Sequence, residues 1–173
     1  MKCQLLIIFA VLINFSILEE HNSTDTTQIE GFLLCKSCGA DNSILNLIIN
    51  NRISEQAVNV QNLTVSNKSI IVQELTNPLG VRFKVILTKK ANCFKSKGGW
   101  YSGGSWFNKY SWKLCQCPTC KAHVGWMFEL TDLVYRNDPF FPGETGFYGI
   151  ILDSVISESY ADSLLMLDKL LQN

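Results

Sequence analysis

The sequence predicts a mainly antiparallel β domain that is followed by a C-terminal helix. Short runs rich in Val, Ile, Phe and Trp recur from Phe32 onward and are separated by turn residues, which is typical of strands. Only the end of the chain has the apolar spacing of a helix. The 173 residues are 47% apolar and 17% charged, a balance that favours one folded domain with its own core over intrinsic disorder.

The N-terminus has the pattern of a secretory signal peptide. A single lysine at position 2 precedes an apolar run from Leu5 to Leu18, which is shorter than the ~20 residues that a membrane-spanning helix needs. We therefore predict a signal peptide over residues 1–20 and a secreted, extracellular product with no membrane span. The alternative is a buried core helix. Cleavage is expected between Ser16 and Glu20.

The rest of the chain divides into three predicted parts. Residues 21–31 are polar and are expected to form a flexible lead-in, residues 32–152 the β domain, and residues 153–173 a C-terminal helical extension. In a secretory compartment the three N-x-S/T sequons are candidate glycosylation sites. These sequons begin at Asn22, Asn62 and Asn67.

Six segments of the β domain are predicted to be strands because each is apolar or alternates with period two. In the third of them Phe83, Val85 and Leu87 share one face. The segments are 44–49, 69–75, 81–87, 110–115, 124–130 and 147–152.

The predicted C-terminal helix has an apolar stripe with spacing i, i+4, i+7. The stripe consists of Tyr160, Leu164, Leu167 and Leu171, and we expect it to pack back on a sheet; dimerisation through it is the alternative. Ser159 with Asp162 is the expected N-terminal cap.

Two C-x-x-C pairs predict a structural zinc site. Cys35 with Cys38, and Cys117 with Cys120, each place two thiolates on one turn, and two such turns supply four tetrahedral sulfur ligands. A site with four thiolates has no open position for water, so its role would be in folding. In an oxidising compartment, the alternative is that all six cysteines after the signal peptide form three disulfides.

Cys93 and Cys115 remain once the two C-x-x-C pairs are assigned. In a secreted protein the simplest reading of such a pair is a disulfide. Alternation along residues 110–115 puts Trp112 and Leu114 on one face of the strand and Cys115 on the other. The bridge is therefore expected on the side opposite whatever Trp112 lines.

The charge of the chain argues against a nucleic-acid partner that is bound by bulk electrostatics. Fifteen basic residues balance fifteen acidic ones, and the net charge is zero. Residues 82–121 nevertheless contain nine Lys or Arg and no acid. A patch for an anionic partner is one interpretation, and we prefer a solvated face because these residues are spread over several strands.

Three tryptophans flank the second C-x-x-C pair. Trp106 and Trp112 lie on either side of a predicted turn at residues 108–109, and Trp126 follows shortly after the pair. Core packing is the ordinary explanation for such a cluster. Indole rings from three adjacent segments can also form a cage whose flat walls suit a small planar ring.

The combined pattern resembles the CULT domain, the thalidomide-binding domain of cereblon, which also occurs as a stand-alone secreted form. The resemblance covers about residues 32–150 and rests on CKSCG, NPLGVRF and SWFNKYSW-x4-CPTC-x2-HVGWMF, with matching spacing of both cysteine pairs and all three tryptophans. It implies a β-tent fold of two antiparallel sheets pinned by the zinc site. It also implies a pocket of three tryptophans for uracil-like or cyclic-imide rings.

The resemblance also implies further ligand-binding residues. The imide of the ring would pair with the backbone of Gly104, Ser105 and Trp106, while Asn77-Pro78 and Phe128 would complete the wall. Vertebrate cereblon has a histidine where this chain has Gly104, so one hydrogen bond to the imide is expected to be absent. The segments that precede the domain in cereblon are not present, so we expect no docking to a ubiquitin ligase.

We expect a binding module and no catalytic residues. Zinc-bearing methionine-sulfoxide reductases share the tent architecture and are the enzyme alternative. They need a nucleophilic cysteine beyond the two C-x-x-C pairs, and no cysteine follows Cys120. His123 is expected to be a structural hydrogen-bonding residue. A cation cage for choline or methyl-lysine is the second alternative, and it is disfavoured because residues 82–128 contain no carboxylate.

Overall fold

The computed structural model describes residues 31–172. The predicted signal peptide, its cleavage window, nearly all of the lead-in and the sequon at Asn22 therefore lie outside the described residues. The elements in chain order are β1 Phe32–Cys35, β2 Asp41–Ile44, the 3-10 helix η1 Leu45–Leu47, β3 Asn59–Val65, β4 Lys68–Thr76, β5 Arg82–Thr88, β6 Tyr110–Gln116, β7 His123–Leu130, α1 Thr131–Asn137, β8 Phe147–Ile151, η2 Leu152–Ser154, β9 Val155–Ser157 and α2 Glu158–Leu171.

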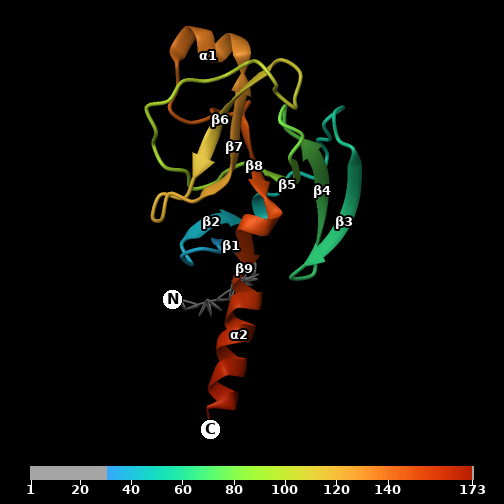
Figure 1. Cartoon of the computed structure of the whole chain (residues 1–173), viewed down its shortest axis with the longest axis vertical. Coiled ribbons are helices and arrows are strands. Elements are labelled where there is room, and N and C mark those ends of the chain that lie inside the picture. The colour runs from blue at the N-terminus through green and yellow to red at the C-terminus, as the bar shows by residue number, and fades with distance from the viewer. Residues whose placement is uncertain (1–30, 173) are drawn as a thin grey trace, which may run out of the picture.

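The strands form two antiparallel sheets (Figure 1). The larger sheet has the order β3-β4-β5-β8-β7-β6, and the smaller sheet has the order β2-β1-β9. Every pairing within these sheets is antiparallel. The predicted fold class, a mainly β domain of two antiparallel sheets with a C-terminal helix, is confirmed.

The larger sheet separates two apolar clusters because side chains alternate between its faces. One cluster packs the smaller sheet against the larger one and contains Leu33, Ile86, Met127 and Ile150. The other cluster lies on the opposite face and is rich in aromatic residues, namely Trp106, Phe107, Trp126, Phe128 and Phe147. The predicted face of Phe83, Val85 and Leu87 belongs to this aromatic cluster.

Strands β7 and β8 approach each other closely at two glycines. Gly125 is paired opposite Ile150, and a Cβ atom at Gly125 would overlap the carbonyl oxygen of Gly149. The ladder between β6 and β7 has an irregularity at the same point, between Cys115 and Gln116. This register places both Trp126 and Phe128 on the aromatic face, next to β6.

Five of the six predicted strands are present, and the strand predicted at residues 44–49 is wrong. Strand β2 ends at Ile44, and residues 45–47 form a 3-10 turn. The strand in this region is β2, which lies at residues 41–44 and was not predicted because Asp41, Asn42 and Ser43 favour turns. Ser43 is held in the sheet region by its hydroxyl, which bonds the hydroxyl of Thr88 at 2.9 Å and donates to the carbonyl of Lys90 at 2.7 Å.

The expectation for the C-terminal helix is partly wrong. The helix exists, but its cap is Ser157, whose side chain accepts a hydrogen bond from the amide of Tyr160, and not Ser159 with Asp162. No residue of α2 is buried, so the apolar stripe does not pack back on a sheet. Figure 1 shows α2 projecting away from the sheets. Among residues 31–172, no helix is long and apolar enough to cross a membrane.

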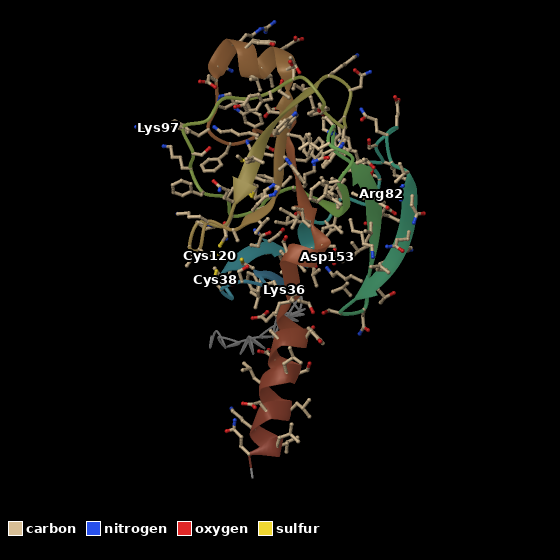
Figure 2. The ribbon with its side chains drawn as sticks, in the orientation of Figure 1. Lys36, Cys38, Arg82, Lys97, Cys120 and Asp153 are labelled. Carbon is tan, nitrogen blue, oxygen red and sulfur yellow. A yellow bond between two sulfur atoms is a disulfide. The ribbon has the colours of Figure 1, made fainter. Side chains whose placement is uncertain are left out.

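The basic residues of segment 82–121 do not form one patch. Figure 2 shows Arg82 and Lys97 on opposite sides of the molecule. Lys113 is 4% exposed and lies over the rings of Trp100 and Phe140. Burial lowers the pKa of Lys113, while Asp138 acts in the opposite direction. The dispersion that underlies the preferred expectation of a solvated face is therefore present, but the expectation fails at Lys113, which is buried.

Candidate functional site

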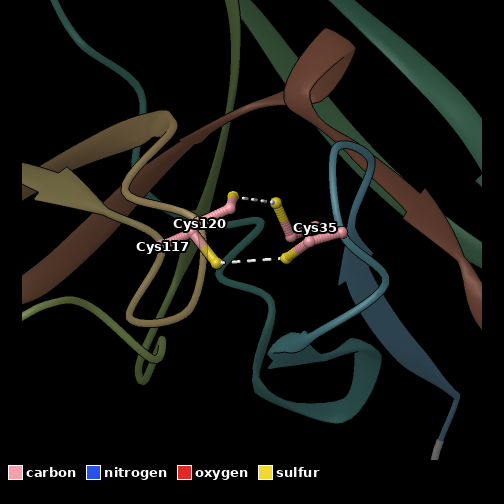
Figure 3. Close-up of side chains that lie close together, drawn as sticks. Cys35, Cys117 and Cys120 are labelled. Atoms are coloured by element: carbon pink, nitrogen blue, oxygen red, sulfur yellow. Dashed lines mark hydrogen bonds between the residues drawn. The ribbon is translucent and has the colours of Figure 1, made fainter.

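The four cysteines of the two C-x-x-C pairs come together from distant parts of the chain (Figure 3). Cys35 ends β1, Cys38 lies in the turn that follows, and Cys117 and Cys120 lie in the connection between β6 and β7. The sulfur of Cys35 is 3.7 Å from that of Cys120, and the sulfur of Cys38 is 3.6 Å from that of Cys117. All four sulfurs lie within 4.8 Å of one another.

This geometry fits a tetrahedral metal site. Zinc–sulfur bonds of ~2.3 Å in a tetrahedron place neighbouring sulfurs about 3.8 Å apart, which is close to the two shortest distances observed here. A disulfide requires about 2.0 Å, and all four cysteines are free. Cys93 and Cys115 are bonded to each other. The alternative of three disulfides is therefore contradicted, and the predicted Cys93–Cys115 bridge is confirmed.

The local backbone favours a thiolate at one of these cysteines. Burial acts to raise the pKa of Cys117, but hydrogen bonds from the backbone amides of Cys120 and Thr119 and from the thiols of Cys38 and Cys120 together outweigh it and lower the pKa to about 7. By contrast, burial raises the pKa of Cys35 to about 12. A bound cation would overcome this cost, because metal coordination deprotonates a thiol.

The aromatic face of the larger sheet contains a cavity of about 420 Å³. The strand residues at its wall are Phe83 from β5, Trp112 and Leu114 from β6, and His123, Trp126 and Phe128 from β7. The connecting loops contribute Asn77, Pro78, Leu79, Gly104 and Trp106. None of these lining residues is acidic.

Ring contacts fix the back of this cavity. Trp126 meets Trp106, Phe83 and His123 edge to face, with centroid distances of 4.6, 5.0 and 4.7 Å. Trp106 and Trp126 are 6% and 8% exposed, so both belong to the core as well as to the cavity wall. Trp112 is half-buried and packs against Tyr101, with ring centroids 5.1 Å apart.

Hydrogen bonds hold two of the three indoles in place. The Nε1 of Trp106 donates to the carbonyl of Thr76 at 2.8 Å, and the Nε1 of Trp112 donates to the carbonyl of Gly103 at 2.9 Å. Both donors are thus directed to the protein backbone. What these two side chains offer to a ligand is the face of each ring.

Two loops close the cavity. The Oδ1 of Asn77 accepts hydrogen bonds from the amides of Leu79 and Val81, which shapes the loop that carries Pro78. Gly104 has φ +67°, and a Cβ atom there would lie 3.1 Å from Cγ of Pro78. The glycine therefore serves both the left-handed backbone and the close approach of the two loops.

All but one of the predicted ligand-binding residues line this cavity. The exception is Ser105, which lines a different depression, donates through its hydroxyl to the carbonyl of Phe107 and accepts through its own carbonyl from Gln56. The cavity also includes Leu79, Phe83, Leu114 and His123, which were not assigned to it. Alternation alone could have added Leu114 to Trp112, and Phe83 to the aromatic face.

Two other polar groups near the site have structural partners. The Nε2 of His123 lies 2.9 Å from the carbonyl of Gly125, and burial lowers the pKa of His123 against the opposing effect of this bond. Glu129 is 1% exposed, and its carboxylate accepts from the amides of Leu130 and Gly143 and from the hydroxyl of Thr145. Glu129 therefore anchors the loop before β8.

Comparison with known proteins gives a partial match. No protein-family model matches the chain. One relative is cereblon of Danio rerio, to which the chain is 36% identical over 52 residues, or 30% of this chain and 12% of the relative. The similarity is partial. The match covers only a small part of the relative's length, and it supports the resemblance that the cysteine and tryptophan pattern indicates.

Proposed function

We propose that this protein is a metal-stabilised binding module whose aromatic pocket takes a small neutral planar heterocycle, such as a uracil-like ring or a cyclic imide. The pocket is the observation that carries this proposal. Its ~420 Å³ volume, its aromatic walls and its lack of acidic residues suit a flat, uncharged ring of modest size.

The polar edge of the ligand would be bound by backbone groups at the pocket mouth. The indole donors of Trp106 and Trp112 are already used within the protein. The segment from Gly104 to Trp106 lies beside the pocket, and its backbone supplies the pairing partners that the resemblance to the cereblon domain suggests. The carbonyls of Ser105 and Trp106 already accept hydrogen bonds from Gln56 and Ser54, so we propose the carbonyl of Gly104 and the amide of Trp106 for this role. In this arrangement the indole rings would stack on the faces of the ligand, and the main chain would form the hydrogen bonds to its polar edge.

We propose zinc as the metal and a structural role for it. Four thiolates satisfy a tetrahedral zinc ion completely, and the donor set of four sulfurs favours a soft or borderline metal. The metal would tie the end of β1 to the β6–β7 connection and so hold the smaller sheet against the larger one; its ligands would be Cys35, Cys38, Cys117 and Cys120. Bound there, zinc would supply folding free energy.

We propose no catalytic role, on the basis of the side chains in the described part of the chain. A reductase of the methionine-sulfoxide type needs a nucleophilic thiol, and the two cysteines outside the metal cluster are joined in a disulfide in the described part of the chain. Glu129 is engaged by three donors. A cation cage is disfavoured by the absence of a carboxylate among the pocket residues.

We further propose that the protein is secreted and glycosylated. The N-terminal signal pattern supports secretion. Asn62 and Asn67 lie on the hairpin of β3 and β4. Both side chains are exposed, which leaves room for an N-linked glycan. Mass spectrometry of the protein purified from culture medium would identify the new N-terminus and any glycans.

The binding proposal is tested by titration of the full chain with uridine, glutarimide and choline, followed by intrinsic tryptophan fluorescence and calorimetry. We expect saturable binding of uridine or glutarimide and none of choline. Trp112→Ala should weaken that binding, whereas Trp100→Phe is the matched control, because Trp100 lies outside the pocket and donates to the carbonyl of Pro139. Absence of binding at millimolar concentration, or a preference for choline, would contradict the proposal.

A further inference from the structure

The first turn of helix α2 is hydrogen-bonded to the β domain. The carboxylate of Glu158 accepts from the amide of Phe32 at 3.5 Å, and the hydroxyl of Ser159 bonds that of Ser66 at 2.7 Å. Beyond this turn, the helix runs clear of both sheets (Figure 1). Its direction is therefore set at the base, while its whole length remains accessible.

The exposed helix carries a regular apolar seam. Tyr160, Leu164, Leu167 and Leu171 follow one another at intervals of four, three and four residues, which is the d-a-d-a pattern of a coiled coil. Their exposed fractions are 56%, 46%, 54% and 78%. A continuous apolar seam of this kind on a soluble surface marks an interaction site.

The charges of α2 favour another protein helix over an anionic membrane as the partner. Glu158, Asp162 and Asp168 outnumber Lys169, so the helix is acidic, whereas helices that lie on membranes are rich in Lys and Arg on their polar face. A parallel pair of α2 helices would set Ser163 of one copy against Asp168 of the other. No like charges then face each other across the seam.

We propose that α2 pairs with the α2 of a second copy of this chain along the seam, which makes the protein a homodimer. The helix of 14 residues is about 21 Å long. Four side chains per copy at roughly 100 Å² each give a buried area on the order of 800 Å² in total. Specific interfaces of this size are weak and reversible, so the dimer is expected to dissociate on dilution.

The pairing would also leave the pocket and the metal cluster free. Both sites lie in the β domain, and neither includes a residue of α2. The dimer would thus present two pockets on one molecule and bind a target that displays two ligand groups more tightly than a single pocket does. This consequence depends on the proposed binding function, but the dimer itself does not.

The test compares two substitutions of the same residue type on opposite sides of the helix. Leu167→Asp introduces a charge into the seam. Leu165→Asp is the matched control, because Leu165 is 64% exposed and lies roughly 130° around the helix from the centre of the seam. Neither residue is buried, so both variants should keep the fold, which far-UV circular dichroism and metal content would verify.

Sedimentation velocity and light scattering from about 1 to 200 μM would measure the association, over the range expected for weak interfaces. We expect wild type and Leu165→Asp to shift from monomer to dimer with concentration, and Leu167→Asp to remain monomeric. A wild-type chain that is monomeric throughout would overturn the proposal. So would co-sedimentation with phosphatidylcholine vesicles that Leu167→Asp abolishes without any change in self-association, since the partner would then be a membrane surface.

Discussion

Trp106 and Trp126 meet edge to face in the β domain, with ring centroids 4.6 Å apart and planes at 76°. Each ring is more than nine-tenths buried, yet both line the cavity. The two residues therefore contribute to folding and to the pocket at once. Trp112 differs, because it is half-buried and packs mainly against Tyr101 at the pocket edge.

This difference predicts opposite outcomes for two alanine substitutions. Trp106→Ala should destabilise the fold by about 3–5 kcal/mol, as expected for removal of a buried aromatic side chain. Trp112→Ala should preserve most of the stability and weaken ligand binding by roughly ten- to hundredfold, because one stacking surface is worth ~1–3 kcal/mol. Urea unfolding and ligand titration measure the two effects. Equal destabilisation by both substitutions would contradict the assignment of separate roles.

A second prediction concerns the left-handed backbone at Gly104. Gly104→His introduces the histidine that the resemblance to cereblon suggests at this position, and it would be expected to tighten imide binding only if φ were negative. The observed φ is +67°. The new Cβ would also lie 3.1 Å from Pro78. We therefore expect Gly104→His and Gly104→Ala each to cost roughly 1–2 kcal/mol of stability and to widen the pocket mouth. Tighter imide binding by Gly104→His at unchanged stability would refute this.

A third prediction concerns the metal. Purified protein should contain one zinc per chain by mass spectrometry, and Cys117→Ser should leave the domain largely unfolded, since structural zinc contributes on the order of 10 kcal/mol. Ser37→Ala is the matched control, because it changes a residue between two cysteine ligands without removing a sulfur. A chelator should have the same effect as Cys117→Ser. A folded, metal-free domain would argue against the structural role.

A fourth prediction follows from the lowered pKa of His123. Because the pKa in the folded state lies below the ordinary value of ~6.5, the unfolded chain takes up the proton first as pH falls. The contribution of His123 to the free energy of unfolding should therefore be fully present above about pH 6.5 and decrease as the pH falls below it. His123→Gln should remove this part of the pH dependence, measured as the difference between the two proteins in urea unfolding at neutral and mildly acidic pH. Imidazole signals in NMR report the pKa directly, and a value above 6.5 would contradict the prediction.

The main strands and the metal cluster could be predicted because their signals are local. Strand alternation, as at Phe83, Val85 and Leu87, needs only the period of the side chains. Each C-x-x-C pair is by itself a recognisable metal-binding motif. Once these four cysteines are assigned, Cys93 and Cys115 remain as the pair expected to form a disulfide. Strands β1, β2, β3 and β9 and helix α1 were not predicted. Strands β1, β2 and β9 have only three or four residues each, and helix α1 has seven. Strand β3 is longer, but its sequence NVQNLTV is largely polar and contains residues such as Asn59 and Asn62 that disfavour strands.

The sequence by itself determined the residue types: four cysteines in two C-x-x-C pairs, three tryptophans around the second pair, and an apolar stripe on the last helix. Only the tertiary structure decided their surroundings. It turned Ser105 away from the pocket, added His123 to it, and left the stripe of α2 without a sheet to cover it. The reason is physical: a side chain's type and period are properties of the chain, whereas its burial depends on which distant segments pack against it.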